Sequence, residues 1–164
     1  GGTGAAWADP VALTGDAGSD RLTGGSAADD LQGGGDNDTI KGRGGADGLA
    51  GEQGVDTLVY RGSPSGVIVD LGNASDGPQS ASGGHATGDA ISGFENATGS
   101  SFGDDLGGSV TANLLTGLLG HDTLSGYGGN DTLLGAGGID RFDGGAGTDD
   151  CDRVAGETAV SCER

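Results

Sequence analysis

The sequence predicts an all-β solenoid in which short strands stack as successive rungs. Three observations support this fold class: a nine-residue repeat, a content of 40 glycines among 164 residues, and one apolar residue at a constant place in each repeat. Nine residues are too few for a helical hairpin, but they accommodate a turn followed by a short strand. Two repeats then form one coil of 18 residues, and the apolar residue of each strand points into the interior.

The clearest repeats lie in residues 117–152, which consist of four consecutive units: GLLGHDTLS, GYGGNDTLL, GAGGIDRFD and GGAGTDDCD. Each unit has Gly at its first and fourth places, Asp at its sixth and an apolar residue at its eighth. Glycine permits the positive φ angles of tight turns, so each unit is interpreted as a turn followed by a strand. The sixth places hold Asp122, Asp131, Asp140 and Asp149.

Residues 15–59 contain five more units in register: GDAGSDRLT, GGSAADDLQ, GGGDNDTIK, GRGGADGLA and GEQGVDTLV. Their sixth places hold Asp20, Asp29, Asp38, Asp47 and Asp56. Their eighth places, which are expected to point inward, hold Leu22, Leu31, Ile40, Leu49 and Leu58. At the fourth place Ala27 and Asp36 replace glycine, and we expect distorted turns or weaker sites there.

Residues 60–98 break the nine-residue period. The alternation of apolar and exposed positions over residues 67–71 predicts a strand. The composition of residues 72–88 is typical of a surface loop, and residues 89–98 are interpreted as a further rung.

A second repeat block then runs over residues 99–152, and its first two units carry Asp104 and Asn113 at the sixth place. Residues 5–14 are interpreted as an N-terminal cap and residues 153–164 as a C-terminal cap, since the end units of repeat proteins depart from consensus. We therefore expect a single domain over residues 1–164. Two short rolls joined by a linker are the alternative.

These repeats resemble the RTX (hemolysin-type) calcium-binding nonapeptide, whose pattern is G-G-x-G-x-D-x-U-x with U apolar. The resemblance implies a right-handed parallel β-roll with Ca²⁺ held between turns that are 18 residues apart. Simple distances agree with this. Neighbouring strands lie about 4.8 Å apart and calcium–oxygen bonds are about 2.4 Å long, so an ion midway between two rungs reaches both.

The resemblance also implies a ligand set. The side-chain ligands would be Asp20, Asp29, Asp38, Asp47, Asp56, Asp104, Asn113, Asp122, Asp131, Asp140 and Asp149, with Asp89 and Glu95 as further candidates. Backbone carbonyls would complete the sites, namely those of Asp16, Gly18, Gly33, Gly35, Leu118, Gly120, Tyr127, Gly129, Gly135, Gly137, Gly144 and Ala146. We expect about seven ions, three from the pairs of the first block and four from those of the second.

The composition favours bound cations, because they would offset the repulsion between acidic residues. The formal net charge is −18 and aromatic residues make up only 4% of the chain, so a conventional core is thin and acid repulsion is strong. The same charge argues against nucleic acid as a partner. No apolar run approaches the roughly 20 residues of a membrane helix.

Catalytic motifs are not expected to operate in this chain. Gly99–Gly103 matches the G-x-S-x-G pattern, but it lies within a repeat and no helix follows it. His85 and His121 are the only histidines, and they do not form an HExxH zinc motif. We therefore expect a protein that is not an enzyme.

Cys151 and Cys162 are the only cysteines, and a disulfide between them is expected to pin the last rung. Two free thiols are the alternative. No further unit is expected to stack on Asp140 and Asp149. The expected function is that of a secreted, monomeric, calcium-binding roll that folds on binding Ca²⁺. The alternative is an accessory module of a larger secreted enzyme or adhesin that binds polysaccharide or a cell surface.

Overall fold

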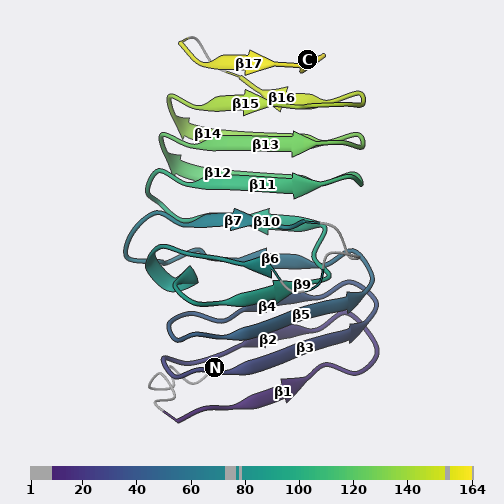
Figure 1. Ribbon diagram of the computed structural model, residues 1–164, viewed down its shortest axis with the longest axis vertical. Coiled ribbons are helices and arrows are strands. Elements are labelled where there is room, and N and C mark those ends of the chain that lie inside the picture. The colour runs from purple at the N-terminus through teal and green to yellow at the C-terminus, as the bar shows by residue number, and fades with distance from the viewer. Residues whose placement is uncertain (1–8, 73–76, 78, 154–155, 164) are drawn as a thin grey trace.

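One face of the molecule is a single parallel sheet of seven strands (Figure 1). The computed structural model describes residues 9–72, 77, 79–153 and 156–163. Along the stack this sheet contains β2 (Arg21–Thr23), β4 (Thr39–Lys41), β6 (Thr57–Val59), β10 (Asn96–Thr98), β12 (Leu114–Gly120), β14 (Thr132–Gly138) and β16 (Asp150–Asp152). The predicted parallel β-roll is confirmed.

The opposite face is divided into two sheets of five strands each. The first contains β1 (Ala12–Thr14), β3 (Asp30–Gly35), β5 (Gly48–Gln53), β9 (Ala90–Ser92) and β8 (Gln79–Ser80). The second contains β7 (Ile68–Asp70), β11 (Asp105–Ser109), β13 (Thr123–Tyr127), β15 (Arg141–Asp143) and β17 (Thr158–Val160). One short 3₁₀ helix, η1 (Gly84–Ala86), lies between β8 and β9. Among the described residues no helix is long and apolar enough to cross a membrane.

The strand register follows the repeat. Leu31 pairs with Leu49 and Leu115 pairs with Leu133, so each apolar eighth place lies above the same place of the next coil. Most of these side chains are between 0% and 2% exposed, and they form one continuous ladder of apolar contacts through the interior. The ladder weakens at the N-terminal end, where Leu13 is 37% exposed. Burial of these side chains stabilises the stack by roughly 1.5–3 kcal/mol each.

The irregular segment inserts extra strands into the divided face. Val67, Val69 and Leu71 are buried while Ile68 is 56% exposed, as the alternation predicts. The chain then returns antiparallel: β8 pairs with β9, and Ser82 exchanges backbone hydrogen bonds with Ile68. The segment from Gln79 to Ser82 therefore lies between β9 and β7 and joins the two five-stranded sheets into one face.

This arrangement differs from the surface loop expected over residues 72–88. Ala81 and Ala86 are buried in the core cluster, so part of the segment belongs to the roll. Strand β8 contains only two residues within a polar, glycine-rich segment, so the composition did not predict it. Residues 73–76 and 78 of the expected loop lie outside the described residues, as do residues 5–8 and residues 154, 155 and 164 of the two expected caps.

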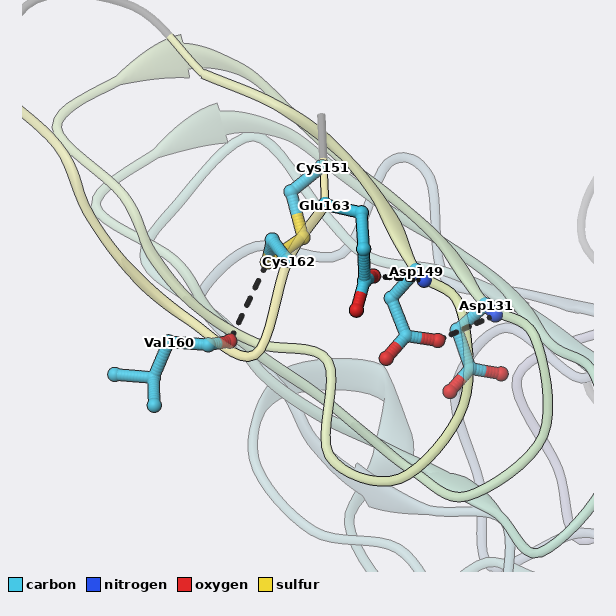
Figure 2. The surroundings of a disulfide bond; sticks show 6 residues. All are labelled: Asp131, Asp149, Cys151, Val160, Cys162 and Glu163. Atoms are coloured by element: carbon cyan, nitrogen blue, oxygen red, sulfur yellow. Dashed lines mark hydrogen bonds between the residues drawn. A yellow bond between two sulfur atoms is a disulfide. The ribbon is translucent and has the colours of Figure 1, made fainter.

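The predicted disulfide is present. Cys151 and Cys162 are joined, with their Cα atoms 5.9 Å apart (Figure 2). Cys151 is 3% exposed and occupies the inward place of β16. A further strand does stack beyond the last full unit, because β17 pairs with β15. This strand belongs to the expected C-terminal cap and is not a further nonapeptide unit.

Candidate metal sites

The sixth-place residues stack in two columns, one before the strands of each face. Column I precedes the seven-stranded sheet and contains Asp20, Asp38, Asp56, Glu95, Asn113, Asp131 and Asp149. Column II precedes the divided face and contains Asp29, Asp47, Asp89, Asp104, Asp122 and Asp140. Apart from Asp20 and Glu95, which are half-buried, these residues are at most 4% exposed.

A ladder of hydrogen bonds holds the acids in place. At most rungs of the two repeat blocks, the backbone N–H of a sixth-place residue donates to Oδ1 of the acid 18 residues later, as Asp38 does to Asp56 at 2.7 Å and Asp131 does to Asp149 at 2.9 Å. The same bond joins Asp20 to Asp38 and Asp122 to Asp140. A carboxylate that accepts such a bond has one oxygen fixed by the preceding rung, and its orientation is set before any ion binds.

The second oxygen of most of these acids has no hydrogen-bond partner. Eight buried Oδ2 atoms are unpaired, those of Asp20, Asp38, Asp47, Asp56, Asp122, Asp131, Asp140 and Asp149. Buried carboxylate oxygens are normally paired, because an unpaired one costs several kcal/mol of lost solvation. Their repetition at one place of the repeat indicates a cation site rather than an isolated defect.

The first-place glycines leave the space into which these oxygens project. A methyl carbon added to Gly126 would come within 3.0 Å of both Oδ2 of Asp131 and the carbonyl oxygen of Gly144, one coil further on. A methyl carbon on Gly33 would meet Oδ2 of Asp38 and the carbonyl of Gly51 in the same way. Oxygens from two adjacent rungs therefore converge on a volume that only glycine leaves open.

Burial also alters the acidity of these groups. It raises the pKa of Asp47, Asp56 and Asp131 above the ordinary carboxyl value. For Asp122, burial and then the neighbouring Asp104 and Asp140 raise the pKa to about 6, against the effect of the hydrogen bond from the Asp104 backbone. Such groups favour a bound cation, since it compensates the charge that burial penalises.

Three sixth-place residues depart from this arrangement. Oδ2 of Asp29 accepts the N–H of Gly25, and Oδ2 of Asp104 accepts the N–H of Ser100, each at 2.6 Å. Asn113 accepts the N–H of Ser109 at 2.6 Å. These oxygens are already occupied by their own turns. Both acids have a free oxygen in only four of the seven expected pairs, 20/38, 38/56, 122/140 and 131/149.

Asp89 lies in column II, but its second oxygen is occupied. Its Oδ1 accepts the N–H of Asp47, while Oδ2 accepts the hydroxyl of Tyr60 at 2.8 Å. Tyr60 is 1% exposed, so this hydrogen bond is buried. Burial raises the pKa of Asp89 to about 6. The Tyr60 hydroxyl therefore pairs the carboxylate oxygen that is left unpaired at most other rungs. The series of unpaired oxygens in column II is interrupted at this rung.

The expected carbonyl ligands lie in the turns beside the acids, and several also join the rungs. The carbonyls of Asp16, Tyr127 and Ala146 accept hydrogen bonds from Gly35, Ala146 and Gly129. Each carbonyl oxygen keeps a second lone pair for a metal. Among the described residues no group of three or more His, Cys, Asp or Glu side chains gathers around one point. A cation here would therefore depend on two carboxylates and on backbone oxygens, which Ca²⁺ accepts.

Sequence reasoning missed Tyr60, Ser161 and Glu163. Asp47 pairs with Asp89, and the N–H of Asp56 donates to Glu95, across an insertion that hides the 18-residue spacing. At the C-terminal end Glu163 accepts the N–H of Asp149, only 14 residues away. The nonapeptide register gives no signal for any of these contacts.

The whole chain contains seven Lys and Arg residues, and four of them lie in its N-terminal half: Arg21, Lys41, Arg43 and Arg61. Lys41 donates to the carbonyl of Arg61. Burial lowers the pKa of Lys41, and the charges of Arg43, Arg21 and Arg61 lower it further. The cluster was not anticipated, because its members are dispersed from residue 21 to residue 61.

Comparison with known families identifies the repeats. The family of the RTX calcium-binding nonapeptide repeat matches the chain in four copies, over residues 12–36, 23–58, 107–142 and 116–151. Together these copies span more than half of the chain, in the two blocks where the acids show the 18-residue spacing. No curated protein matches the chain.

Proposed function

Because the chain belongs to the family of RTX calcium-binding nonapeptide repeats, we propose that it is an extracellular structural roll that folds when it binds several Ca²⁺ ions. The calcium-binding structural role follows from the family and from the parallel β-roll. The place of action, the coupling to folding and the number of ions are the parts that we propose.

The single observation that carries the proposal is the set of eight unpaired carboxylate oxygens. They lie at one repeated place in the space that glycine leaves open, and in column I a carbonyl of the next rung lies beside them. Calcium fits this donor set because it takes six to eight oxygen ligands with flexible geometry at about 2.4 Å. Magnesium, which requires octahedral geometry and bonds of about 2.0–2.1 Å, fits the spacing of two rungs less well.

We expect the ions to differ in affinity. The pairs 20/38, 38/56, 122/140 and 131/149 present an unpaired oxygen from both acids. The pairs 29/47, 104/122 and 113/131 present one, because Asp29, Asp104 and Asn113 use theirs within their own turns. We therefore expect about seven ions, of which four bind more tightly than the other three. When bound, each ion would supply positive charge between two stacked carboxylates.

Coupling to folding follows from charge. A chain with a net charge of −18 that stacks its acids in two columns repels itself when no cation is present. Sites formed by two rungs do not exist in the unfolded chain, so binding free energy becomes folding free energy. Millimolar calcium outside the cell would meet this requirement. The Cys151–Cys162 disulfide supports the same location, since such bonds persist in oxidising environments.

The test is a calcium titration followed by far-ultraviolet circular dichroism, with bound ions counted by native mass spectrometry. We expect a disordered spectrum with chelator and a β spectrum with millimolar Ca²⁺, while Mg²⁺ at the same concentration is much less effective. Asp38→Asn removes an acid shared by two pairs and should raise the calcium midpoint. Asp30→Asn, an exposed neutralisation in β3, is the matched control.

Three results would contradict the proposal. A protein with a full β spectrum in chelator would exclude folding on calcium. Fewer than four bound ions at saturation would exclude the pairing proposed here. Equal effects of the Asp38 and Asp30 variants would show that only net charge matters.

The cation cluster favours a second candidate function, an accessory module that binds an anionic polysaccharide. After the larger effect of burial, the charges of Arg43, Arg21 and Arg61 lower the pKa of Lys41, so these four cations lie near one another on an otherwise acidic protein. A bound polyanion would relieve the repulsion among them. Immobilised dextran sulfate should retain the calcium-loaded protein and neutral dextran should not. The double variant Arg21→Gln/Arg61→Gln should weaken retention several-fold, whereas Arg141→Gln, an exposed cation in β15, should not.

A further inference from the structure

Column I of acids continues beyond the last repeat. Asp149 donates its N–H to Oε2 of Glu163, as Asp131 donates to Asp149 one coil earlier. In return the N–H of Glu163 donates to the carbonyl of Asp149 at 2.9 Å. Figure 2 shows Asp131, Asp149 and Glu163 in a row beside the disulfide. Glu163 thus takes the position of a sixth-place acid, although no nonapeptide surrounds it.

The oxygens around Gly144 repeat the geometry of the regular sites. Asp149 is 2% exposed and its Oδ2 has no hydrogen-bond partner. A methyl carbon added to Gly144 would come within 3.0 Å of that oxygen and of the carbonyl of Ser161. In the regular rung below, the equivalent methyl carbon on Gly126 would meet Asp131 and the carbonyl of Gly144. Ser161 therefore supplies the carbonyl that a first-place glycine supplies elsewhere.

The disulfide explains how this short return reaches its position. Cys162 lies between Ser161 and Glu163, and its bond to Cys151 fixes it against the inward place of β16. The return uses 14 residues from Asp149 to Glu163 in place of 18. Glu has one methylene more than Asp, which extends its carboxylate toward the column.

We propose that Asp149, Glu163 and the carbonyl of Ser161 form a calcium site at the C-terminal end of column I, and that the Cys151–Cys162 disulfide positions this site. Glu163 is exposed, so water can complete the coordination. The inference rests on the proposed function, because it assigns one more ion to the same kind of site.

The structure also predicts a coupling between the disulfide and the ion. The bond links two residues that are 11 apart in the sequence and restricts the conformations that the segment with Ser161 and Glu163 can adopt before the ion binds. A site that is organised before binding has a smaller ordering cost and therefore a higher affinity. Without the bond, we expect the terminal ion to bind more weakly while the ions of the regular rungs are unaffected.

The test is native mass spectrometry of the full chain at graded Ca²⁺ concentrations, with circular dichroism as the check on folding. Glu163→Gln keeps the shape of the side chain and removes its charge, so one ion should be lost or should bind about tenfold more weakly. Asp150→Asn, an exposed neutralisation in β16 beside Asp149, is the control and should bind as the wild type does. Cys162→Ala should weaken the same ion.

A double-variant comparison assigns the ion to this pair. In an Asp149→Asn background, Glu163→Gln should have little further effect, because the terminal site is already impaired. Independent losses from the two variants would overturn the shared site. Wild-type calcium binding by Glu163→Gln would do the same while leaving the proposed function intact.

The remaining outcomes separate the other two ideas. A wild-type protein that binds no calcium would overturn both the proposed function and the terminal site. A Cys162→Ala protein with unchanged ion count and affinity would overturn the positioning role of the disulfide alone.

Discussion

At the scale of single residues, the glycines of the repeat serve two different needs. Fourth-place glycines adopt positive φ, as Gly138 and Gly147 do at 152°, and Asp36 does so at 71°, whereas Ala27 does not. First-place glycines are absent from the positive-φ set, and their requirement is space for the converging oxygens. The argument that glycine permits positive φ in the turn therefore applies to the fourth place and not to the first.

This distinction predicts opposite results for two glycines of one unit. Gly126→Ala places a methyl carbon within 3.0 Å of Asp131 and Gly144, so we expect weaker calcium binding and a destabilisation of roughly 1–3 kcal/mol. Gly128→Ala is the control, because its methyl carbon would lie 3.7 Å from the nearest heavy atom and its φ is not positive. Calcium titrations and urea denaturation at saturating Ca²⁺ measure both effects. Equal losses at the two positions would contradict the steric explanation.

At the scale of elements, most strands contribute one buried apolar side chain, and the stack depends on that ladder. Leu115 in β12 is 0% exposed, whereas the adjacent Leu114 points outward and is 40% exposed. The inward side chains form one core cluster. Truncation of an inward side chain therefore removes its contacts with the rungs above and below it.

Leu115→Ala is therefore expected to lower the free energy of unfolding by about 2–5 kcal/mol. Leu114→Ala removes the same number of atoms from the same strand and should change it by less than about 1 kcal/mol. Denaturation of both variants in saturating Ca²⁺ provides the comparison. Similar losses would mean that β12 does not face the interior as described.

The elements also show where sequence reasoning succeeds and where it stops. The 18-residue spacing predicted the parallel pairing, the inward leucines and the acids of both repeat blocks, because register and side-chain direction follow directly from a strict period. It could not predict that Tyr60 bonds to Asp89, or that Gln79–Ser82 runs antiparallel between β9 and β7. Those contacts join residues across an insertion, where three-dimensional packing and not periodicity decides the partners.

At the scale of the whole molecule, the buried acids make the calcium-free roll sensitive to pH. Asp89 and Asp122 have pKa values of about 6, raised mainly by burial from the ordinary 3.8. A raised carboxyl pKa means that the folded state holds a proton that the unfolded chain has released. Between pH 3.8 and about 6 the folded apo state therefore gains stability as the pH falls, and above that range the penalty for the charged form is complete.

We accordingly expect more β structure in chelator at pH 5 than at pH 7.5. Calcium needs the charged carboxylates, so protons compete with it and the apparent calcium affinity should fall over the same interval. Circular dichroism without calcium and calcium titrations at both pH values test the two halves of this prediction. A calcium midpoint that does not move between these pH values would contradict it.

The inserted strands β7 and β8 lengthen the divided face but not the opposite sheet. Between β5 and β11 the divided face passes through β9, β8 and β7, whereas the opposite sheet passes from β6 to β12 through β10 alone. At about 4.8 Å per strand, one side is about 10 Å longer than the other. In Figure 1 the strands of the N-terminal half slope relative to the nearly horizontal strands of the C-terminal half. The two repeat blocks therefore present their outward side chains in different directions on either side of the inserted strands.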